Sequence, residues 1–410
     1  MVDVAIMGHI GDAGYIGAIA LATMVFNLIY WNFGFLRMGT SGLTAQAFGA
    51  GDKEEYLHVL VRGMAIALGA ALLLIVLQGP IAYLCKRWIH SSKETIALML
   101  TYFSIRIWAA PANLALYVLK GWFIGMQNAK TPMWIAIILN IVNIICSLIF
   151  VFALHAGIAG VAWGTVIAQY SGLAIAMTMW FVKYGHLRHD IHVRESLRLR
   201  EMVRFFQVNA DIFLRTLCLI AVFTFIPYIS AEMGDEILAA NTLLMQLFTL
   251  LSYIMDGFAY AGESLVGRFV GAEDYKSLKI CVRNLLYWGV GLSTVFTALY
   301  ATCGRGLLSI LTNDKTVIDT AMHYMLWTIL VPFTGFAAFI YDGIYIGATA
   351  SKAMRNVMFV ATGSFFIVYY LLRQPAGNDG LWIAFLLFLT LRGLLMFLGQ
   401  KKWVMSPTPR

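Results

Sequence analysis

The feature that most constrains this chain is a series of long apolar stretches that recurs from one end to the other. A helix needs roughly 20 mostly apolar residues to cross a bilayer, and only helices or closed barrels satisfy every backbone group there. The alternating ten-residue segments typical of a barrel are absent. Each stretch is therefore predicted to be a membrane-spanning helix, and there are eleven, near residues 15–47, 57–84, 95–126, 132–153, 157–181, 207–231, 236–266, 281–303, 317–347, 353–372 and 380–399.

The first residues, Met1 to Gly8, look like the end of one further span. No positively charged segment precedes them, so they do not have the pattern of a signal peptide. Because a span cannot begin at its own midpoint, we expect the natural coding sequence to supply roughly 20–35 more residues, mostly apolar, before Met1. The predicted fold class is all-α, a polytopic membrane protein of twelve transmembrane helices with the first one truncated.

Composition excludes a soluble protein. Of the 410 residues, 60% are hydrophobic and 12% are charged, against roughly 45–50% and roughly 25% in soluble domains. The net charge of +8 has no basic block or soluble domain behind it, so it indicates membrane topology and predicts no nucleic-acid partner. The five cysteines form no CxxC pair and are interpreted as packing residues, so no metal site is expected.

An internal repeat divides the chain at a constant offset of 222 residues. It is carried by three pairs of segments: Gly49-Ala50-x-Asp52 with Gly271-Ala272-x-Asp274, Gly121 to Gly125 with Gly343 to Gly347, and Lys130 with Lys352. An even number of spans in each copy gives both copies the same orientation, so the sequence predicts two parallel six-helix repeats. The predicted organisation is an N-lobe at 1–182, a cytoplasmic linker at 183–204, a C-lobe at 205–400 and a cytoplasmic tail at 401–410.

Lys and Arg set the predicted orientation. The loops on one side of the membrane, together with the C-terminal tail, carry 17 Lys and Arg residues. The loops on the other side carry six. The positive-inside rule therefore places the C-terminus and the 183–204 linker in the cytoplasm of a plasma membrane protein. In that linker Leu197, Leu199, Met202 and Val203 alternate with arginines, which fits either a basic interfacial helix on anionic lipid or a plain solvated connection.

Several motifs together resemble the multidrug and toxic compound extrusion (MATE) family, and its DinF branch in particular. They are Val2-Asp3 with Gly8-His9, Gln46 with Gly49 to Asp52, Tyr102 with Ile105 to Trp108 and Pro111, Gly121-Trp122 with Gly125, Asn209 with Asp211 to Phe213 and Arg215-Thr216, and Asp256-Gly257 with Ala259 to Ala261 and Glu263. The resemblance covers the whole chain and lacks only the segment expected before Met1. It implies twelve helices in two lobes and the efflux of organic cations or other amphipathic compounds, driven by inward H⁺ or Na⁺.

Candidate coupling residues in the N-terminal half follow from the cost of polar groups at bilayer depth. Asp3 matches the family's first-helix aspartate, and an apolar cavity would raise its pKa enough to load a proton. Asn143 and Ser147 lie four residues apart on one helix face. Many relatives carry Asn and Asp at these two positions, with a Thr that matches Thr165. The serine removes one anionic ligand, which favours H⁺ over Na⁺; bonding to neighbouring backbone is the plain alternative.

The C-terminal half holds more charge. Asp211 and Arg215 lie four residues apart and could form an ion pair. Asp256, Tyr260 and Glu263 share one helix face.

With the truncated span counted as the first, Asp342 occupies the tenth span, where some relatives place a coupling carboxylate. Arg106, near the middle of the fourth span, could pair with any of these acids. We expect Asp211, Asp256, Glu263 and Asp342 to converge on one polar cavity, because isolated carboxylates in lipid would be costly. Arg106, Arg215 and Tyr260 are expected to line the substrate cavity or to form ion pairs.

The predicted function is a secondary antiporter, with a small-molecule substrate, the lipid bilayer as its environment and a monomeric state. Its only expected cofactor is the coupling ion, H⁺ or Na⁺. A lipid or polysaccharide flippase of the same superfamily is the alternative, although such proteins typically have basic cavities. An enzyme is not expected, because the chain contains no Walker A, HExxH or GxSxG motif.

Overall fold

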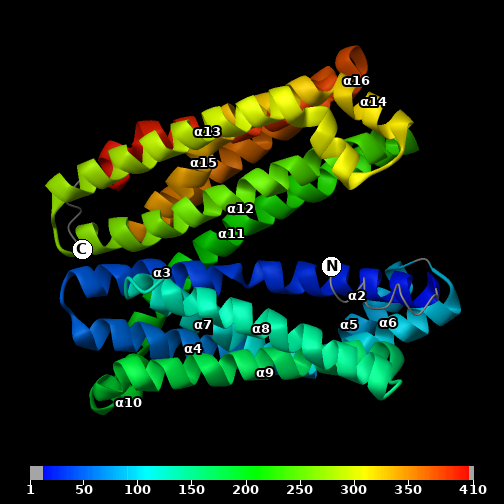
Figure 1. The fold of residues 1–410 in the computed structure, drawn as a ribbon. Helices are drawn as coiled ribbons and strands as arrows, with labels where there is room; N and C mark the ends of the chain where they lie inside the picture. Colours follow the sequence, from blue (N-terminus) through cyan, green and yellow to red (C-terminus); the bar gives the residue numbers. More distant parts are fainter. Residues whose placement is uncertain (1–12, 90, 406–410) are drawn as a thin grey trace. The chain divides into compact units, whose positions relative to one another are not determined.

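The computed structural model describes residues 13–89 and 91–405 (Figure 1). Within these residues the chain is helical and contains no strand. Ten helical segments in the described part are long and apolar enough to cross a membrane. The last, α16 (Ser351–Trp403), changes direction at Gly377, where φ is 52°, and so merges two spans. The eleven predicted spans are thus accounted for, while Met1 to Gly8 lie outside the described residues.

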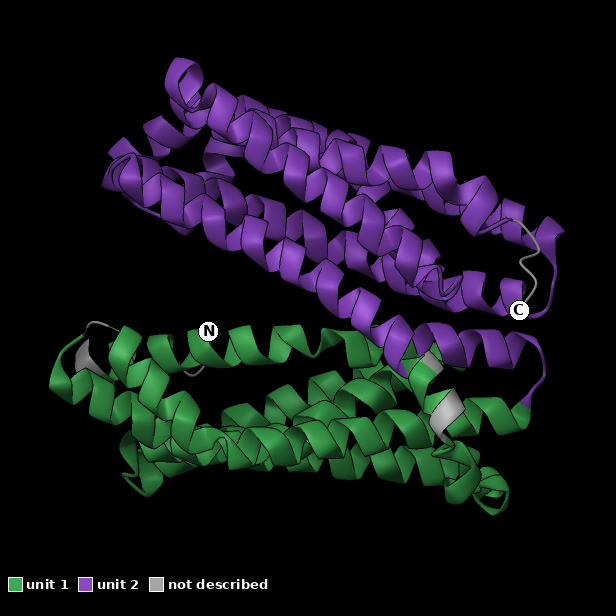
Figure 2. Ribbon diagram, turned by 180° about the vertical axis from the view of Figure 1, so that it is seen from behind, with its two compact units in different colours: residues 1–40, 53–205 green, residues 41–52, 206–410 purple. Residues whose placement is uncertain are grey.

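The chain packs into two units (Figure 2). Unit 1 comprises the residues up to Thr40 and Lys53–Phe205, and unit 2 comprises Ser41–Asp52 and the chain from Phe206 onward. The lobe boundaries predicted from the sequence follow the repeat, whereas these units follow packing. The helices up to the linker are α2 (Ala13–Asn32), α3 (Gly34–Gly49), α4 (Lys53–Val76), α5 (Gln78–Trp88), α6 (Lys93–Arg106), η1 (Ile107–Ala109), α7 (Ala110–Gly125), α8 (Lys130–Leu148), η2 (Ile149–Ala153) and α9 (Gly157–Tyr184).

The remaining elements are η3 (Gly185–Asp190), α10 (Val193–Ser196), α11 (Leu199–Glu232), α12 (Asp235–Gly271), α13 (Tyr275–Leu311), α14 (Lys315–His323), α15 (Met325–Gly347) and α16. At about 1.5 Å per residue, the 37 residues of α12 span about 56 Å, longer than a bilayer of about 40–45 Å with its headgroups. The core of unit 2 is rich in aromatic side chains, with Phe365, Phe385 and Phe388 almost completely buried.

The turns repeat at the predicted offset of 222. After α3, the amide of Asp52 donates to the carbonyl of Ala47 at 3.0 Å, and after α12 the amide of Asp274 donates to Phe269 at 3.0 Å. The turns after α7 and α15 also match, since Asn128 donates to Phe123 and Ala350 to Tyr345, each at 2.9 Å. Positive φ angles fall at matching positions: Gly51 (72°) with Glu273 (56°), and Gln127 (61°) with Thr349 (51°).

Glycines mark the helix crossings, and these repeat as well. A Cβ on Gly121 would overlap the carbonyl of Arg37, and a Cβ on Gly343 would overlap that of Ala259, which is the same contact moved by 222 residues. Within unit 2, Gly49 packs in the same way on Arg268, and Gly271 packs on Gln46. Residue 268 is the counterpart of 46 and residue 271 that of 49, so this last contact is reciprocal. Small residues of this kind let membrane helices approach backbone to backbone.

The 183–204 linker forms neither a continuous interfacial helix nor a fully solvated connection. It consists of η3, the single turn of α10 and the start of α11. Ser196 is completely buried, its carbonyl accepts a hydrogen bond from Arg62 Nε at 2.8 Å, and its hydroxyl lies 2.6 Å from His58 Nδ1. These two contacts hold the single turn of α10 against α4.

Candidate functional site

In unit 1 the predicted polar residues of the fifth and sixth spans do meet. Asn143 Nδ2 on α8 donates to Thr165 Oγ1 on α9 at 3.2 Å, and Thr165 in turn donates to the carbonyl of Val161 at 3.1 Å. Ser147 is completely buried beside Gly164, and its hydroxyl has no hydrogen-bond partner among the described residues. The group is neutral, so it offers oxygen ligands without a carboxylate. Asp3, the predicted acid of this half, lies outside the described residues.

Arg106 has aromatic partners in unit 1. Its guanidinium lies 4.8 Å from the centre of the Phe26 ring and donates to the hydroxyl of Tyr102 at 3.0 Å. A cation over an aromatic face is stabilised by the negative face of the ring. Among the described residues, these are the contacts of Arg106, and its predicted ion pair stays a prediction because Asp3 lies outside them.

The main charge cluster of unit 2 surrounds Asp342 on α15. Its Oδ2 accepts hydrogen bonds from Arg392 on α16, at 2.7 Å, and from Arg215 on α11. Asp256 on α12 is close enough to attract the Arg392 guanidinium. Asp342, Arg215 and Arg392 are all buried. Two carboxylates thus face two guanidiniums across four helices, and the formal charges of this four-charge cluster cancel.

Asp211 belongs to a second ion pair. Its Oδ1 accepts from Arg355 at 2.5 Å and its Oδ2 accepts from Ser351 at 2.9 Å, both at the start of α16. The predicted pair of Asp211 with Arg215 is therefore replaced by two others, Asp211 with Arg355 and Asp342 with Arg215. Asp342 and Asp256 thus act on Arg392, while Asp211 pairs with Arg355.

Glu263 and Tyr260 lie on α12, as predicted, and differ in exposure. Glu263 is buried with 1% of its surface exposed, whereas Tyr260 is 39% exposed. Asp256 is half-buried, one turn before Tyr260.

The sequence interpretation missed Arg392, which supplies half of the positive charge in the four-charge cluster. A signal was available, because Arg392 is a lone charge within the apolar stretch 380–399. A charge at that depth is costly unless it has a partner. Arg355, the partner of Asp211, was not among the predicted site residues either.

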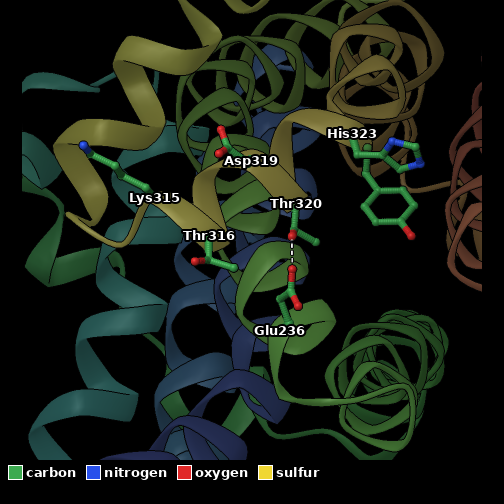
Figure 3. Close-up of a pocket in the computed structure, with 7 residues that line it drawn as sticks. Glu236, Lys315, Thr316, Asp319, Thr320 and His323 are labelled. Carbon is green, nitrogen blue, oxygen red and sulfur yellow. Dashed lines mark hydrogen bonds between the residues drawn. The ribbon is translucent and has the colours of Figure 1, made fainter.

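A separate pocket of about 520 Å³ lies where α14 meets the start of α12 (Figure 3). Thr320 donates to the carboxylate of Glu236, and Asp319 pairs with Arg305 at 2.8 Å on an exposed surface. None of the predicted site residues lines this pocket. The buried four-charge cluster is therefore the stronger candidate for a functional site.

Comparison with known proteins identifies the family of the chain. The family model described as MatE matches residues 1–149 and 212–371, one stretch in each half. The chain is 34% identical to the DNA damage-inducible protein F of Escherichia coli (strain K12), over 98% of this chain and 88% of that protein. It is 24% identical to the chloroplastic Protein DETOXIFICATION 44 of Arabidopsis thaliana, over 96% of this chain and 76% of that protein.

Solved structures have the same fold. The Vibrio cholerae MATE transporter VcmN in its bent form superposes with a TM-score of 0.85 at 19% identity, covering 98% of this chain and 91% of that one. A MOP superfamily transporter from Pyrococcus furiosus gives 0.83 at 18% identity, covering 99% and 92%. The chain is a multi-pass membrane transporter, not an enzyme, and it belongs to the MatE family. Within that family it falls in the DinF branch.

Proposed function

We propose that the protein exports organic cations or amphipathic compounds in exchange for inward H⁺, with Na⁺ as the alternative coupling ion, and that the four-charge cluster of unit 2 carries the coupling. The observation behind this proposal is the arrangement around Asp342. Its Oδ2 accepts from two arginines, while its Oδ1 is buried and has no hydrogen-bond partner among the described residues. Oδ1 is therefore the atom at which a proton would add.

Protonation at Oδ1 would disturb the charge balance. A neutral Asp342 withdraws the negative charge that Arg215 and Arg392 share, and weakening the compensation of a buried charge is costly, up to several kcal/mol. The four helices that carry the cluster would have to rearrange or admit water to lower that cost. Proton binding and helix arrangement are thus linked, and such linkage is what antiport requires, since each ligand must disfavour the binding of the other.

A cationic substrate would act on the same balance. Asp256 is only half-buried, so it can interact with a solvated cation while Asp342 stays with the arginines. A cation beside Asp256 would weaken the hold of that carboxylate on Arg392. Substrate and proton would then compete for the negative charge of one cluster.

The test uses the full chain in proteoliposomes with an imposed ΔpH or ΔNa⁺ and a fluorescent cationic dye. Asp342→Asn and Asp256→Asn should each abolish ΔpH-driven export at normal protein levels. Asp319→Asn is the matched control, because it removes an exposed carboxylate of the same unit. If both cluster variants export the dye as fast as the parent, this coupling site is wrong. If the parent exports the dye under ΔNa⁺ but not under ΔpH, Na⁺ is the coupling ion.

A further inference from the structure

Three hydroxyl groups in the middle of α3 are buried and have no hydrogen-bond partner in the described part of the chain. They belong to Thr40, Ser41 and Thr44, whose side chains are completely buried. A buried polar group without a partner has lost its bonds to water and gained none in return. Native structures contain few such groups, so three of them within residues 40–44 need a physical reason.

Other buried hydroxyls of this chain bond backward along their own helix. Thr216 donates to the carbonyl of Ile212 at 2.9 Å, and Ser230 donates to that of Ile226 at 2.8 Å. In both cases the acceptor lies four residues earlier, and a bond of this kind often bends the helix that contains it. The three hydroxyls of α3 also have helical carbonyls four residues before them, and they leave these acceptors unused.

The same hydroxyls lie where α3 passes from one unit to the other (Figure 2). The helix belongs to unit 1 up to Thr40 and to unit 2 from Ser41 onward. The change falls inside a continuous helix, Gly34–Gly49, with no loop to absorb a change of direction. Any such change must therefore be taken up by the helix itself.

Each half of α3 is fixed to its own unit. In unit 1, Gly121 of α7 packs directly on the backbone of Arg37. In unit 2, Gln46 Nε2 donates to the carbonyl of Gly347, at the end of α15, at 3.0 Å. Because both halves are fixed, a movement of one unit against the other has to bend α3 between residues 37 and 46. The three hydroxyls occupy the middle of that interval.

The repeat offers a comparison, because α12 is the counterpart of α3 and lies wholly within unit 2. The counterparts of the three hydroxyl residues, at the offset of 222, are Gly262, Glu263 and Val266. None of these has a hydroxyl group. The buried hydroxyls thus occur in the copy of the helix that passes between the units and not in the copy that stays within one.

We propose that residues 40–44 are a hinge of α3 and that the hydroxyls of Thr40, Ser41 and Thr44 stabilise its bent form. In the straight form described above they have no partner. In the bent form each hydroxyl donates to the carbonyl four residues before it. These bonds offset the cost of bending, so the two forms are close in free energy and both are populated. The hinge rests on the proposed function, because alternating access requires the two units to move against each other.

The test compares Thr40→Val/Thr44→Val with Thr328→Val in the full chain. Thr328 also has a completely buried hydroxyl without a partner among the described residues, but its helix, α15, stays in unit 2. Valine keeps the shape of threonine, so both variants should raise the midpoint of thermal unfolding in detergent. Only the α3 variant should slow ΔpH-driven export of the cationic dye, by roughly tenfold for two lost bonds. Thr40→Ser/Thr44→Ser keeps the hydroxyls and should export like the parent.

Amide hydrogen exchange tests the hinge without relying on transport. After correction for intrinsic rates, the parent should be less protected in a peptide covering residues 40–47 than in the counterpart peptide of α12, residues 262–269. The α3 variant should gain protection there, and Thr328→Val should not. If the parent exports no dye under either gradient while this exchange pattern holds, the proposed function fails and the hinge stands.

Several results would overturn the hinge. One is equal protection of the α3 and α12 peptides in the parent. Another is a lower thermal midpoint for the α3 variant, which would mean that its hydroxyls are bonded in the straight form, for example to water. A third is parent-like export by the α3 variant, or an equal loss of export in Thr328→Val. Ser41→Ala, a smaller change, replaces the double variant if that protein does not fold.

Discussion

The two units use different chemistry for the polar groups inside their spans. Unit 1 joins neutral side chains of α8 and α9, whereas unit 2 balances carboxylates against guanidiniums across four helices. The positions do not correspond in the repeat. The counterparts of Asn143, Ser147 and Thr165 at the offset of 222 are Phe365, Tyr369 and Leu387, which are apolar or aromatic residues of unit 2.

One position carries opposite charges in the two repeats. The counterpart of Asp342 is Lys120 on α7, whose ammonium group is close enough to Arg37 to be repelled by it. The duplication thus preserved the glycine crossings and the turns, which depend on backbone shape, but not the polar sites. Backbone packing tolerates few substitutions, whereas a charge can change when its partners change.

Arg392→Leu should have the largest effect on this comparison. It leaves Asp342 with one arginine and removes a fully buried partner, which typically costs about 3–5 kcal/mol. The midpoint of thermal unfolding in detergent measures the loss. Arg305→Leu, which breaks only an exposed pair with Asp319, should cost at most about 1 kcal/mol. Equal shifts for the two variants would show that the four-charge cluster does not hold unit 2 together.

The glycine crossings test what the units share. Gly121→Ala and Gly343→Ala each push a methyl group into a backbone carbonyl, so each should cost about 1–3 kcal/mol. Similar thermal shifts for the two variants would sharpen the equivalence of the crossings, and a tolerant site in either unit would break it. Gly363→Ala, where nothing lies within 4 Å, should instead stabilise by about 0.5–1 kcal/mol.

The neutral group of unit 1 should respond weakly. Thr165→Val removes the acceptor of Asn143, and the loss of one such hydrogen bond costs about 0.5–1.5 kcal/mol. Ser147→Ala removes a hydroxyl that has no partner in the described part of the chain, so its thermal midpoint should stay at the parent value or rise. A larger loss for Ser147→Ala than for Thr165→Val would mean that the serine binds something essential.

The smallest effect is expected at the cap of α13. Hydrogen bonds from Ser277 hold the pKa of Asp274 below its usual range. Because the folded-state pKa is the lower one, this stabilisation is present above the usual carboxyl pKa and is lost as pH falls through the lowered value. Asp274→Ala should therefore unfold slightly earlier than the parent at pH 7, and the difference should shrink as pH falls through the lowered pKa of Asp274. A difference that persists in acid would assign the effect to something other than this carboxylate.

The spans could be predicted because each is a continuous apolar stretch, and the repeat could be predicted because matching residues recur at a fixed offset. Apolar length gave the helices, and recurring residues such as Gly121 and Gly343 gave the offset. The meeting of Asn143 with Thr165 was anticipated through the family resemblance, since those two helices are consecutive. These features depend on residues that are close in the sequence or on matching residues in the two repeats.

The charge partners could not be predicted in the same way. Arg215 lies 127 residues from Asp342, and Arg355 lies 144 from Asp211, so only the packing of the helices brings them together. A spacing of four residues favoured Asp211 with Arg215, but tertiary contacts gave each a different partner. The packing of α10 against α4 could not be predicted either, because its contact is with Arg62, 134 residues before Ser196.

The reciprocal crossing of Gly49 on Arg268 and Gly271 on Gln46 has a consequence for the origin of the chain. An exchange in which residue i contacts the counterpart of j, and j contacts the counterpart of i, is the pattern of an isologous interface between two identical subunits. One six-span ancestor could have formed this contact with a second copy of itself before the two genes were joined. The glycine crossings keep that two-fold pattern in the present chain, whereas the polar residues do not follow it.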